Sequence, residues 1–573
     1  MKKSKLSLLL ILTLVLSMFL AACSGGGDKN EGKETDKGGE KAAEEQLADE
    51  QVLNVLESSE IPAMDSVLAE DTIGFTMISA TQEGLYRLDP DQKVIPGIAE
   101  AAPEFSADNT VLTIKLKKDV KWADGSPVTA KDFVYAWQRS INAETASPYG
   151  PYFMEGKIKG ASEVVEATKA KVEKKEKVTP EDLAPLGIKA LDDYTLEITL
   201  VRPIPFIESY LTFPLFYPQN QKFVEAQGDK YASSAANLLS NGPFKMTKWD
   251  GPTATEWVLE KNETYWNAKN VALTKINFNV SKDPQASANA FTAGEADITP
   301  KLAQAAILSQ YEGDPALLQY QEPSIFWIKM NQTIPALKNE NIRRAIALSV
   351  DKQALVDDVL ANGSIPANFV VPKGFAFFEG KDFRTKENEF LKTNKEEAKK
   401  LWEKGLQELG VKEVKLVYVG GDTETSKLSD SFVKDQLEGN LPGLSLEMKA
   451  VPFKIRIDLE NNKDYGLLFG GWGPDYADPM TFMDLWLTDG SHNNMAYSNP
   501  EFDKMIQSAN EETDLAKRWK TLQDAEKLMI EDDAAVAPMY QRSVNLLIQP
   551  KVKGFAHHAF GPDYSYQWIK ITK

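Results

Sequence analysis

Apolar and polar side chains alternate in several stretches of the chain. Residues 110–116 (TVLTIKL) and 194–200 (YTLEITL) follow this period of two, which predicts half-buried β-strands with one face toward a core. A shorter apolar run, residues 465–469 (YGLLF), predicts a further strand. Strand-like and helix-like stretches intermix without an internal repeat, so the pattern predicts a mixed α/β (α+β) fold.

Other stretches place an apolar residue at every third or fourth position, which is the period of a helix with one buried face. Residues 129–140 predict such a helix, with Thr129 as its N-terminal cap. Residues 341–360 and 515–532 predict two more. The stretch 157–181 is rich in Lys and Glu and predicts an exposed helical excursion rather than a binding site.

The first apolar run of the chain, residues 6–22, follows a lysine-rich start and predicts a secretory signal. It ends in Ala21-Ala22-Cys23, which resembles the lipobox of bacterial lipoproteins, where the cysteine is diacylated. A retained membrane helix and an ordinary buried cysteine are the alternatives. We expect residues 1–22 to be removed and Cys23 to carry two acyl chains, which is the number that stable membrane attachment requires.

The chain that follows Cys23 is strongly acidic. The 573 residues hold 65 Lys and Arg against 84 Asp and Glu, a formal charge of −19, and removal of residues 1–22 would leave 62 against 84, or −22. This charge argues against nucleic acid or an anionic membrane surface as the partner. The segment 23–50 would be the lipidated Cys and a disordered tether, because it is mainly Gly, Lys and Glu. The lipid is then the only expected contact with the membrane.

The sequence carries little that indicates catalysis or a cofactor. It has no glycine-rich phosphate loop and no His-Glu-x-x-His helix, and its three histidines are His492, His557 and His558. Its single Cys excludes an internal disulfide framework and a Cys-based zinc site. We therefore expect no enzyme, no metal and no cofactor. A secreted hydrolase stays open as an alternative, because a catalytic triad is a spatial arrangement.

One segment combines glycine, aromatic and acidic residues, and it follows the predicted strand 465–469. Residues 470–479 read GGWGPDYADP. Glycine lets another backbone approach closely, an indole offers a flat apolar wall, and a carboxylate can meet a cation. Composition alone favours the simpler interpretation, which is a tight turn with a core tryptophan.

The same segment resembles the GW-x-x-DY-x-x-P signature of the oligopeptide-binding proteins of peptide ABC importers, which form family 5 of the extracellular solute-binding proteins. Further motifs of that family occur in the expected order, and the resemblance covers about residues 51–573. They are 81–86 (TQEGLY), 117–133 (KKDVKWADGSPVTAKDF), 240–249 (SNGPFKMTKW), 261–266 (KNETYW), 326–331 and 341–351 (NIRRAIALSVD).

The resemblance implies a periplasmic-binding-protein-like fold with two lobes that close around a ligand. The first lobe would contain an extra domain and would be completed by the C-terminal residues. The two hinge strands would lie at 326–331 and 537–542. The implied ranges are 51–324 for the first lobe, about 84–206 for its extra domain, 325–543 for the second lobe and 544–573 for the return to the first lobe.

The resemblance also implies which residues would hold a peptide. The ligand would lie extended between the lobes and pair through its backbone with two flanking strands. Asp475 would pair with the α-ammonium of the peptide, and Tyr149 would lie near the ligand, although a packed tyrosine is equally compatible. The flanking strands would be supplied by Gly471, Trp472 and Gly473 on one side and by Glu70, Asp71 and Thr72 on the other.

Three positions depart from members of the family that bind short peptides. Phe469, Phe453 and Glu460 stand where such members have Arg, Trp and Arg. A dedicated clamp for the peptide carboxylate is therefore in doubt. The predicted function is a monomeric, lipid-anchored receptor on the outer face of the cell membrane that delivers oligopeptides to an ABC permease driven by a separate ATPase. A signalling peptide, nickel chelate, haem or sugar remains an alternative ligand, because the fold does not decide the ligand class.

Overall fold

The computed structural model describes residues 46–386 and 388–573 of the chain. The signal sequence, Cys23 and nearly all of the expected tether lie outside these residues. The described helices and strands belong to one unit, Leu47–Lys573. Within the described residues, none of the helices combines the length and the apolar character that crossing a bilayer requires.

The N-terminal part of this unit is built on a four-stranded sheet with the order β1-β10-β9-β8. We call the part of the molecule around this sheet the first lobe. β1 runs parallel to β10, and the other neighbours are antiparallel. The strands are β1 (Val52–Glu57), β8 (Phe244–Lys248), β9 (Glu256–Lys261) and β10 (Lys275–Val280).

A separate antiparallel sheet, β4-β5-β7-β6, carries the two alternating stretches of the sequence. Its strands are β4 (Glu104–Phe105), β5 (Val111–Lys115), β6 (Ile188–Asp192) and β7 (Thr195–Thr199), so both strand predictions are confirmed. Helix α3 (Ala130–Ile141) contacts this sheet through β6. Thr129 caps α3 as predicted, because its backbone N–H and hydroxyl both donate to the carboxylate of Asp132.

The second lobe, as we define it, surrounds a six-stranded mixed sheet with the order β12-β18-β11-β17-β15-β16. Helices α14 (Lys395–Leu409), α15 (Glu424–Asn440) and α19 (Leu515–Lys527) belong to this part of the chain. The strands are β11 (Leu317–Met330), β12 (Ile365–Pro366), β15 (Val414–Gly421), β16 (Leu444–Val451), β17 (Leu467–Trp472) and β18 (Val536–Leu547).

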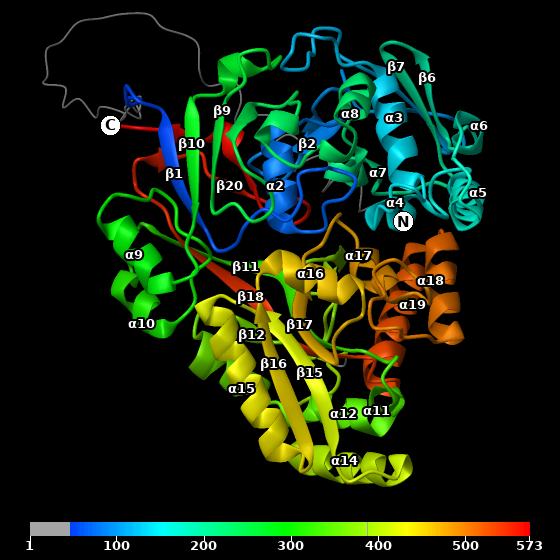
Figure 1. Ribbon diagram of the computed structural model, residues 1–573, viewed down its shortest axis with the longest axis vertical. Coiled ribbons are helices and arrows are strands. Elements are labelled where there is room, and N and C mark those ends of the chain that lie inside the picture. Colours follow the sequence, from blue (N-terminus) through cyan, green and yellow to red (C-terminus); the bar gives the residue numbers. More distant parts are fainter. Residues whose placement is uncertain (1–45, 387) are drawn as a thin grey trace, which may run out of the picture. The chain divides into compact units, whose positions relative to one another are not determined.

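The long strands β11 and β18 pair antiparallel and connect the two lobes (Figure 1). One end of the pair accepts backbone hydrogen bonds from residues 299–302 of the first lobe, at Leu547 and Asn545. The other end pairs with β17 of the second lobe. The β11–β18 register shifts between Gln321 and Ile325, where Pro323 has no N–H to donate.

One predicted helix is interrupted, and another is helical to its predicted end but changes to a π-helical turn there. The stretch 341–360 contains α12 (Glu340–Ser349), then a break at which Asp351 caps a second short helix, α13 (Lys352–Ala354), and a π-helical turn at Leu355–Leu360. The period of the apolar residues continues through this break, so the pattern alone does not reveal it. The stretch 515–532 forms α19 and a π-helical turn at Leu528–Asp532.

Candidate functional site

Strand β17 presents an unpaired edge to a cavity between the lobes. On one side its residues pair with β11, with Gly471 opposite Phe326 and Trp472 opposite Ile325. On the other side β15 pairs only with Leu467 and Leu468. Among the described strands, none covers the edge from Phe469 to Trp472 on that side, and these residues line the cavity. The predicted flanking strand therefore exists up to Trp472, and Gly473 follows its end.

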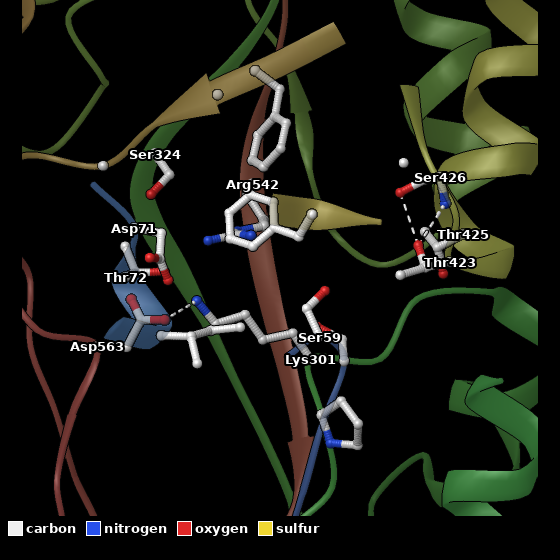
Figure 2. Close-up of a pocket in the computed structure, with 18 of the residues that line it drawn as sticks. Ser59, Asp71, Thr72, Lys301, Ser324, Thr423, Thr425, Ser426, Arg542 and Asp563 are labelled. Carbon is white, nitrogen blue, oxygen red and sulfur yellow. Dashed lines mark hydrogen bonds and ion pairs between the residues drawn. The ribbon is translucent and has the colours of Figure 1, made fainter. Parts of the chain in front are cut away.

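The two glycines beside Trp472 allow the neighbouring chain to approach closely. A methyl group on Gly471 would lie 2.9 Å from the carbonyl oxygen of Ile325 and 3.0 Å from the ring of Phe326. On Gly473 it would lie 3.0 Å from the hydroxyl of Ser324, one of the residues facing the pocket in Figure 2. A side chain at either position would push β17 away from β11, so the strand edge depends on both glycines.

Asp475 lies just beyond β17 and is 4% exposed. Its backbone N–H donates to the hydroxyl of Thr481 at 3.0 Å, whereas its Oδ2 has no hydrogen-bond partner among the described residues. Burial and the nearby carboxylate of Asp484 raise the pKa of Asp475 well above its usual value, and a hydrogen bond with Tyr149 opposes this rise. A buried carboxyl group with a free oxygen in a cavity wall is suited to bind a cation from a ligand.

The aromatic side chains next to Asp475 come from both lobes. Tyr149 begins helix α4 (Tyr149–Met154), and its ring stacks on the indole of Trp472 with centroids 6.1 Å apart. The ring of His492 contacts both at 4.5 and 5.1 Å. Burial lowers the pKa of His492 to about 3, so this ring is neutral at ordinary pH. The structure therefore brings Tyr149, Trp472 and Asp475 together in one wall of the cavity.

The second predicted flanking strand, Glu70–Thr72, is not a strand. Thr72 is the first residue of helix α2 (Thr72–Thr81), and Asp71 caps that helix by accepting the N–H of Gly74 at 2.7 Å. The backbone of Asp71 itself is extended, but residues 70 and 71 are not part of a strand. The strand was placed here only by the family resemblance, whereas a capping aspartate begins a helix. All three residues nevertheless line the cavity.

The cavity has a volume of about 400 Å³, and its Lys and Arg side chains are paired with carboxylates. Lys301 contacts Glu322 at 2.7 Å and Asp563 at 2.8 Å, and the second pair is drawn in Figure 2. Arg542 also binds Glu322, and the two cations lower the pKa of that carboxyl to about 2 against the opposing effect of burial. The remaining pairs are Lys282 with Glu60 and Asp422, Lys329 with Glu460, and Arg456 with Glu460.

Several contacts across the cavity join the lobes directly. Tyr152 donates to Asp484 at 2.7 Å, and Lys157 pairs with the same carboxylate at 3.4 Å. Asn461 donates to both carboxylate oxygens of Glu70, at 2.9 and 3.0 Å. Lys157 is 7% exposed, so the prediction of a fully solvated excursion from this residue onward is wrong at its start. Most of the helix that follows, α5 (Ala161–Lys174), is half-buried or exposed.

Some residues of the site were missed by the sequence analysis. The ion-paired residues of the cavity lie in separate segments of the sequence, and none belongs to a recognisable motif. They are Lys301, Glu322 and Arg542. Asp484 and His492 follow the glycine-rich segment but carry no signal that separates them from other polar residues. Only their convergence in three dimensions identifies them. Phe469, Phe453 and Glu460 all line the cavity, which is where the family comparison placed them.

These features define a two-lobed solute-binding protein, and the comparisons identify its family. The sequence profile of the bacterial extracellular solute-binding proteins, family 5 (middle region), matches residues 93–494. The chain is also 31% identical to the oligopeptide-binding protein OppA of Bacillus subtilis (strain 168) over 580 aligned residues, which cover 98% of this chain and 99% of the relative. The chain belongs to family 5 of the bacterial extracellular solute-binding proteins.

Solved structures agree with the two-lobed fold. The peptide-bound OppA of Listeria monocytogenes is 42% identical, with a TM-score of 0.85, and the match covers 92% of this chain and all of that one. The Escherichia coli murein tripeptide-binding protein MppA matches with a TM-score of 0.81 and 25% identity over 92% of this chain and 99% of that one. The unliganded open form of MppA reaches only 0.58, with 26% identity over the same shares of the two chains. The lobes of the present structure are therefore arranged differently from that open form.

Proposed function

We propose that this protein is the substrate-binding receptor of an ABC importer and captures oligopeptides between its two lobes. The observation that carries the proposal is the buried carboxyl group of Asp475, which has a free oxygen and lies at the end of the unpaired strand edge Phe469–Trp472. The strand edge supplies hydrogen-bonding groups for a peptide backbone, and the carboxyl group supplies a counter-charge for its α-ammonium.

The strand edge explains how one receptor can accept many sequences. Every peptide residue except proline offers the same N–H and C=O, so main-chain pairing contributes affinity without selecting side chains. Gly471 is exposed in the wall of the cavity, where a ligand strand can approach its backbone. The relatives support this interpretation, because OppA of Listeria monocytogenes was solved with a bound peptide.

Membrane attachment, transport and stoichiometry also belong to the proposal. The lipobox-like Ala21-Ala22-Cys23 supports a lipid anchor at Cys23 on the extracellular face of the membrane. An acidic, Gly-rich tether from 23 to 50 would let a monomeric receptor reach an ABC permease beside it. The lobe boundaries at 51–324, 325–543 and 544–573 are part of the same proposal, with the hinge on β11 and β18.

Binding without catalysis fits the residues around the cavity. His492 is the histidine that lines it, and its ring contacts are with Tyr149, Tyr152 and Trp472. Among the described residues, Nε2 of His492 has no hydrogen-bond partner, so no nucleophile is paired with this nitrogen.

Native mass spectrometry of the protein purified without added ligand tests whether the receptor carries peptides. Titration with free and N-acetylated pentapeptides then tests whether the α-ammonium contributes to binding. We expect co-purified peptides or binding of the free pentapeptide, and a large loss of affinity on acetylation. Failure of every unmodified peptide to bind, together with release of a non-peptide ligand on denaturation, would refute a peptide receptor.

A further inference from the structure

A buried lysine of the first lobe reaches a buried carboxylate of the second. Lys157 lies between helices α4 and α5, and its ammonium contacts Asp484 at 3.4 Å. The two side chains are 8% and 4% exposed. Asp484 begins the 3₁₀ helix Asp484–Trp486, shortly after Asp475 in the sequence. The ion pair therefore belongs to neither lobe alone and forms only when the lobes are together.

The first lobe holds Lys157 in place for this contact. Its backbone N–H donates to the carbonyl of Met154 at 3.1 Å, and its own carbonyl accepts from Val201 at 2.9 Å. The ammonium donates to the carbonyl of Tyr152 at 3.0 Å and lies 5.3 Å from the centre of its ring. These partners carry no negative charge. Among the described residues, Asp484 is the one carboxylate that pairs with Lys157.

The first lobe binds Asp484 and Asp475 in parallel ways. Helix α4 carries two tyrosines three residues apart, and their ring centroids are 5.8 Å apart. Tyr152 donates its hydroxyl to Asp484 at 2.7 Å, and Tyr149 hydrogen-bonds to Asp475. The neutral ring of His492 contacts both tyrosines, at 4.5 and 4.6 Å. The two carboxyl groups thus form one acidic pair at this end of the cavity.

Each carboxyl group of this pair makes a charge on the other less favourable. After burial, the charge of Asp484 is the largest cause of the raised pKa of Asp475. Burial also raises the pKa of Asp484, and Lys157 is foremost among the groups that oppose this rise. The other ionisable groups around Asp484 are phenols and one cation that is already paired. They are Tyr152, Tyr210, Tyr476 and Arg518, the last of which contacts Asp478 at 2.7 Å. Two buried carboxylates need two cations, and here the chain supplies one of them.

We propose that Lys157 is a positioning residue of the ligand site, which neutralises Asp484 when the lobes close and leaves Asp475 as the single carboxylate for a single cation of the ligand. This inference rests on the proposed function and assigns what the first lobe contributes to the α-ammonium site. In the closed, liganded receptor two carboxylates meet two cations, one from the first lobe and one from the peptide. Closure without either cation leaves a buried negative charge, so closure and ligand binding depend on each other.

Calorimetric titration of the full receptor with an alanine pentapeptide tests the inference through a double-mutant cycle. The variants are Lys157→Met, Asp484→Asn, which keeps an oxygen for the Tyr152 hydroxyl, and the two combined. Each single variant leaves one buried charge without its partner in the closed state. We therefore expect Kd to rise by about 30-fold or more, which corresponds to about 2 kcal/mol. The combined variant leaves neither charge unpaired, so its Kd should return to within about fivefold of the unmodified receptor.

The pH dependence of Kd separates this role from a purely structural one. In Lys157→Met the closed receptor holds two carboxyl groups and only the cation of the peptide, so one carboxyl group takes up a proton on binding. Because the bound state then holds more protons, Kd should decrease as pH falls from 7.5 to 5.5, by about 10-fold more than in the unmodified receptor. The combined variant should lack this additional dependence. Titration of the peptide amine is common to all these receptors and cancels in the comparison.

A matched control makes the test specific. Lys159→Met makes the same charge change at an exposed position two residues away and should leave Kd and its pH dependence unchanged. The Tm of each unliganded variant establishes that it is folded. If Lys157→Met does not fold, Lys157→Gln, which has a polar side chain without charge, replaces it in the cycle.

The outcomes separate the two proposals. An unchanged Kd in both single variants, additive losses in the combined variant, or equal pH dependence in Lys157→Met and the unmodified receptor would each overturn the role of Lys157 and leave the peptide receptor standing. The same losses in Lys159→Met would assign the effect to the overall charge and overturn that role as well. If the unmodified receptor binds no pentapeptide, the proposed function itself fails, and this inference fails with it.

Discussion

The indole ring of Trp472 lies almost parallel to the phenol ring of Tyr149, with an angle of 11° between their planes. The two residues belong to different lobes, so this stack exists only when the lobes are together. It also forms one wall of the cavity beside Asp475. The contact between the lobes and the proposed contact with the ligand thus involve the same two side chains.

Loss of the Trp472 ring should weaken both contacts. Stacked aromatic pairs contribute about 0.5–1.5 kcal/mol beyond the area they bury, so Trp472→Ala should raise the peptide Kd by about 3- to 10-fold. Trp472→Phe keeps a flat ring and should lose much less. Isothermal titration calorimetry measures both values. An unchanged Kd for Trp472→Ala would contradict a role for the stack in ligand binding.

Removal of the Asp475 carboxyl group should have a larger effect. Asp475→Ala should raise the Kd of a free peptide by about 100-fold, because truncation of one partner of a buried charge pair costs about 2–5 kcal/mol. N-acetylation of the peptide should cost a similar amount in the unmodified receptor and little in the variant. A double-mutant cycle built from these four affinities isolates the pair. Independent, additive losses would show that the α-ammonium is bound elsewhere.

The ion pair at the mouth of the cleft should matter less. Lys282 bridges Glu60 of its own lobe and Asp422 of the other, and all three side chains are partly exposed. Partly exposed pairs contribute about 0–1 kcal/mol, so Lys282→Met should raise Kd by no more than about fivefold. Small-angle scattering should show a larger radius of gyration for the unliganded variant. A loss as large as that of Asp475→Ala would mean that closure depends mainly on this pair.

The unliganded receptor should become less stable as pH rises from about 4.5 to 7. Burial raises the pKa of each of four carboxyl groups in the cavity to about 7: Glu57, Glu70, Asp71 and Asp430. Because their pKa values are higher in the folded chain, the folded state binds more protons than the unfolded state in this range, and deprotonation destabilises it.

Differential scanning fluorimetry without peptide measures this effect. We expect the Tm to be higher at pH 5.5 than at pH 7.5 by at least about 1–2 °C. Replacement of Asp71 and Asp430 by Asn should flatten the profile, whereas Glu263→Gln, at an exposed position outside the cavity, should not. A Tm that rises over this interval in the unmodified receptor would contradict the assignment of these groups.

The lipid anchor can be tested independently of ligand binding. In a bacterial host with a lipoprotein pathway, Cys23→Ala should prevent both lipidation and the removal of residues 1–22. Mass spectrometry of the mature N-terminus should show a diacylated cysteine in the unmodified protein. An unmodified Cys23 in a membrane-free receptor would rule out the anchor.

Local patterns in the sequence predicted the elements that depend on local physics. The two alternating stretches became β5 and β7, and Thr129 caps α3 with Asp132 as its partner. The break near Asp351 was not predicted, because a helix cap inside a periodic stretch is compatible with both a break and a continuous helix. The prediction for residues 70–72 was wrong because it was carried over from the family resemblance. In the structure Asp71 caps helix α2, which begins at Thr72.

Only the part of the candidate site that lies in one short segment of the sequence could be predicted. Gly471, Trp472, Gly473 and Asp475 lie together in the sequence and form one wall of the cavity. The pairing of Lys301 with Glu322 and Asp563 joins segments separated by 21 and 262 residues, and no local pattern contains that information.

The unpaired edge of β17 has a consequence for solubility. Exposed strand edges recruit other extended chains and are common starting points of aggregation. Here the edge lies inside a cavity of about 400 Å³, whose walls include both lobes. A single extended chain fits such a space, but the sheet of another folded protein does not. With its lobes together, the receptor can therefore keep a strand edge available for its ligand without offering that edge to its neighbours.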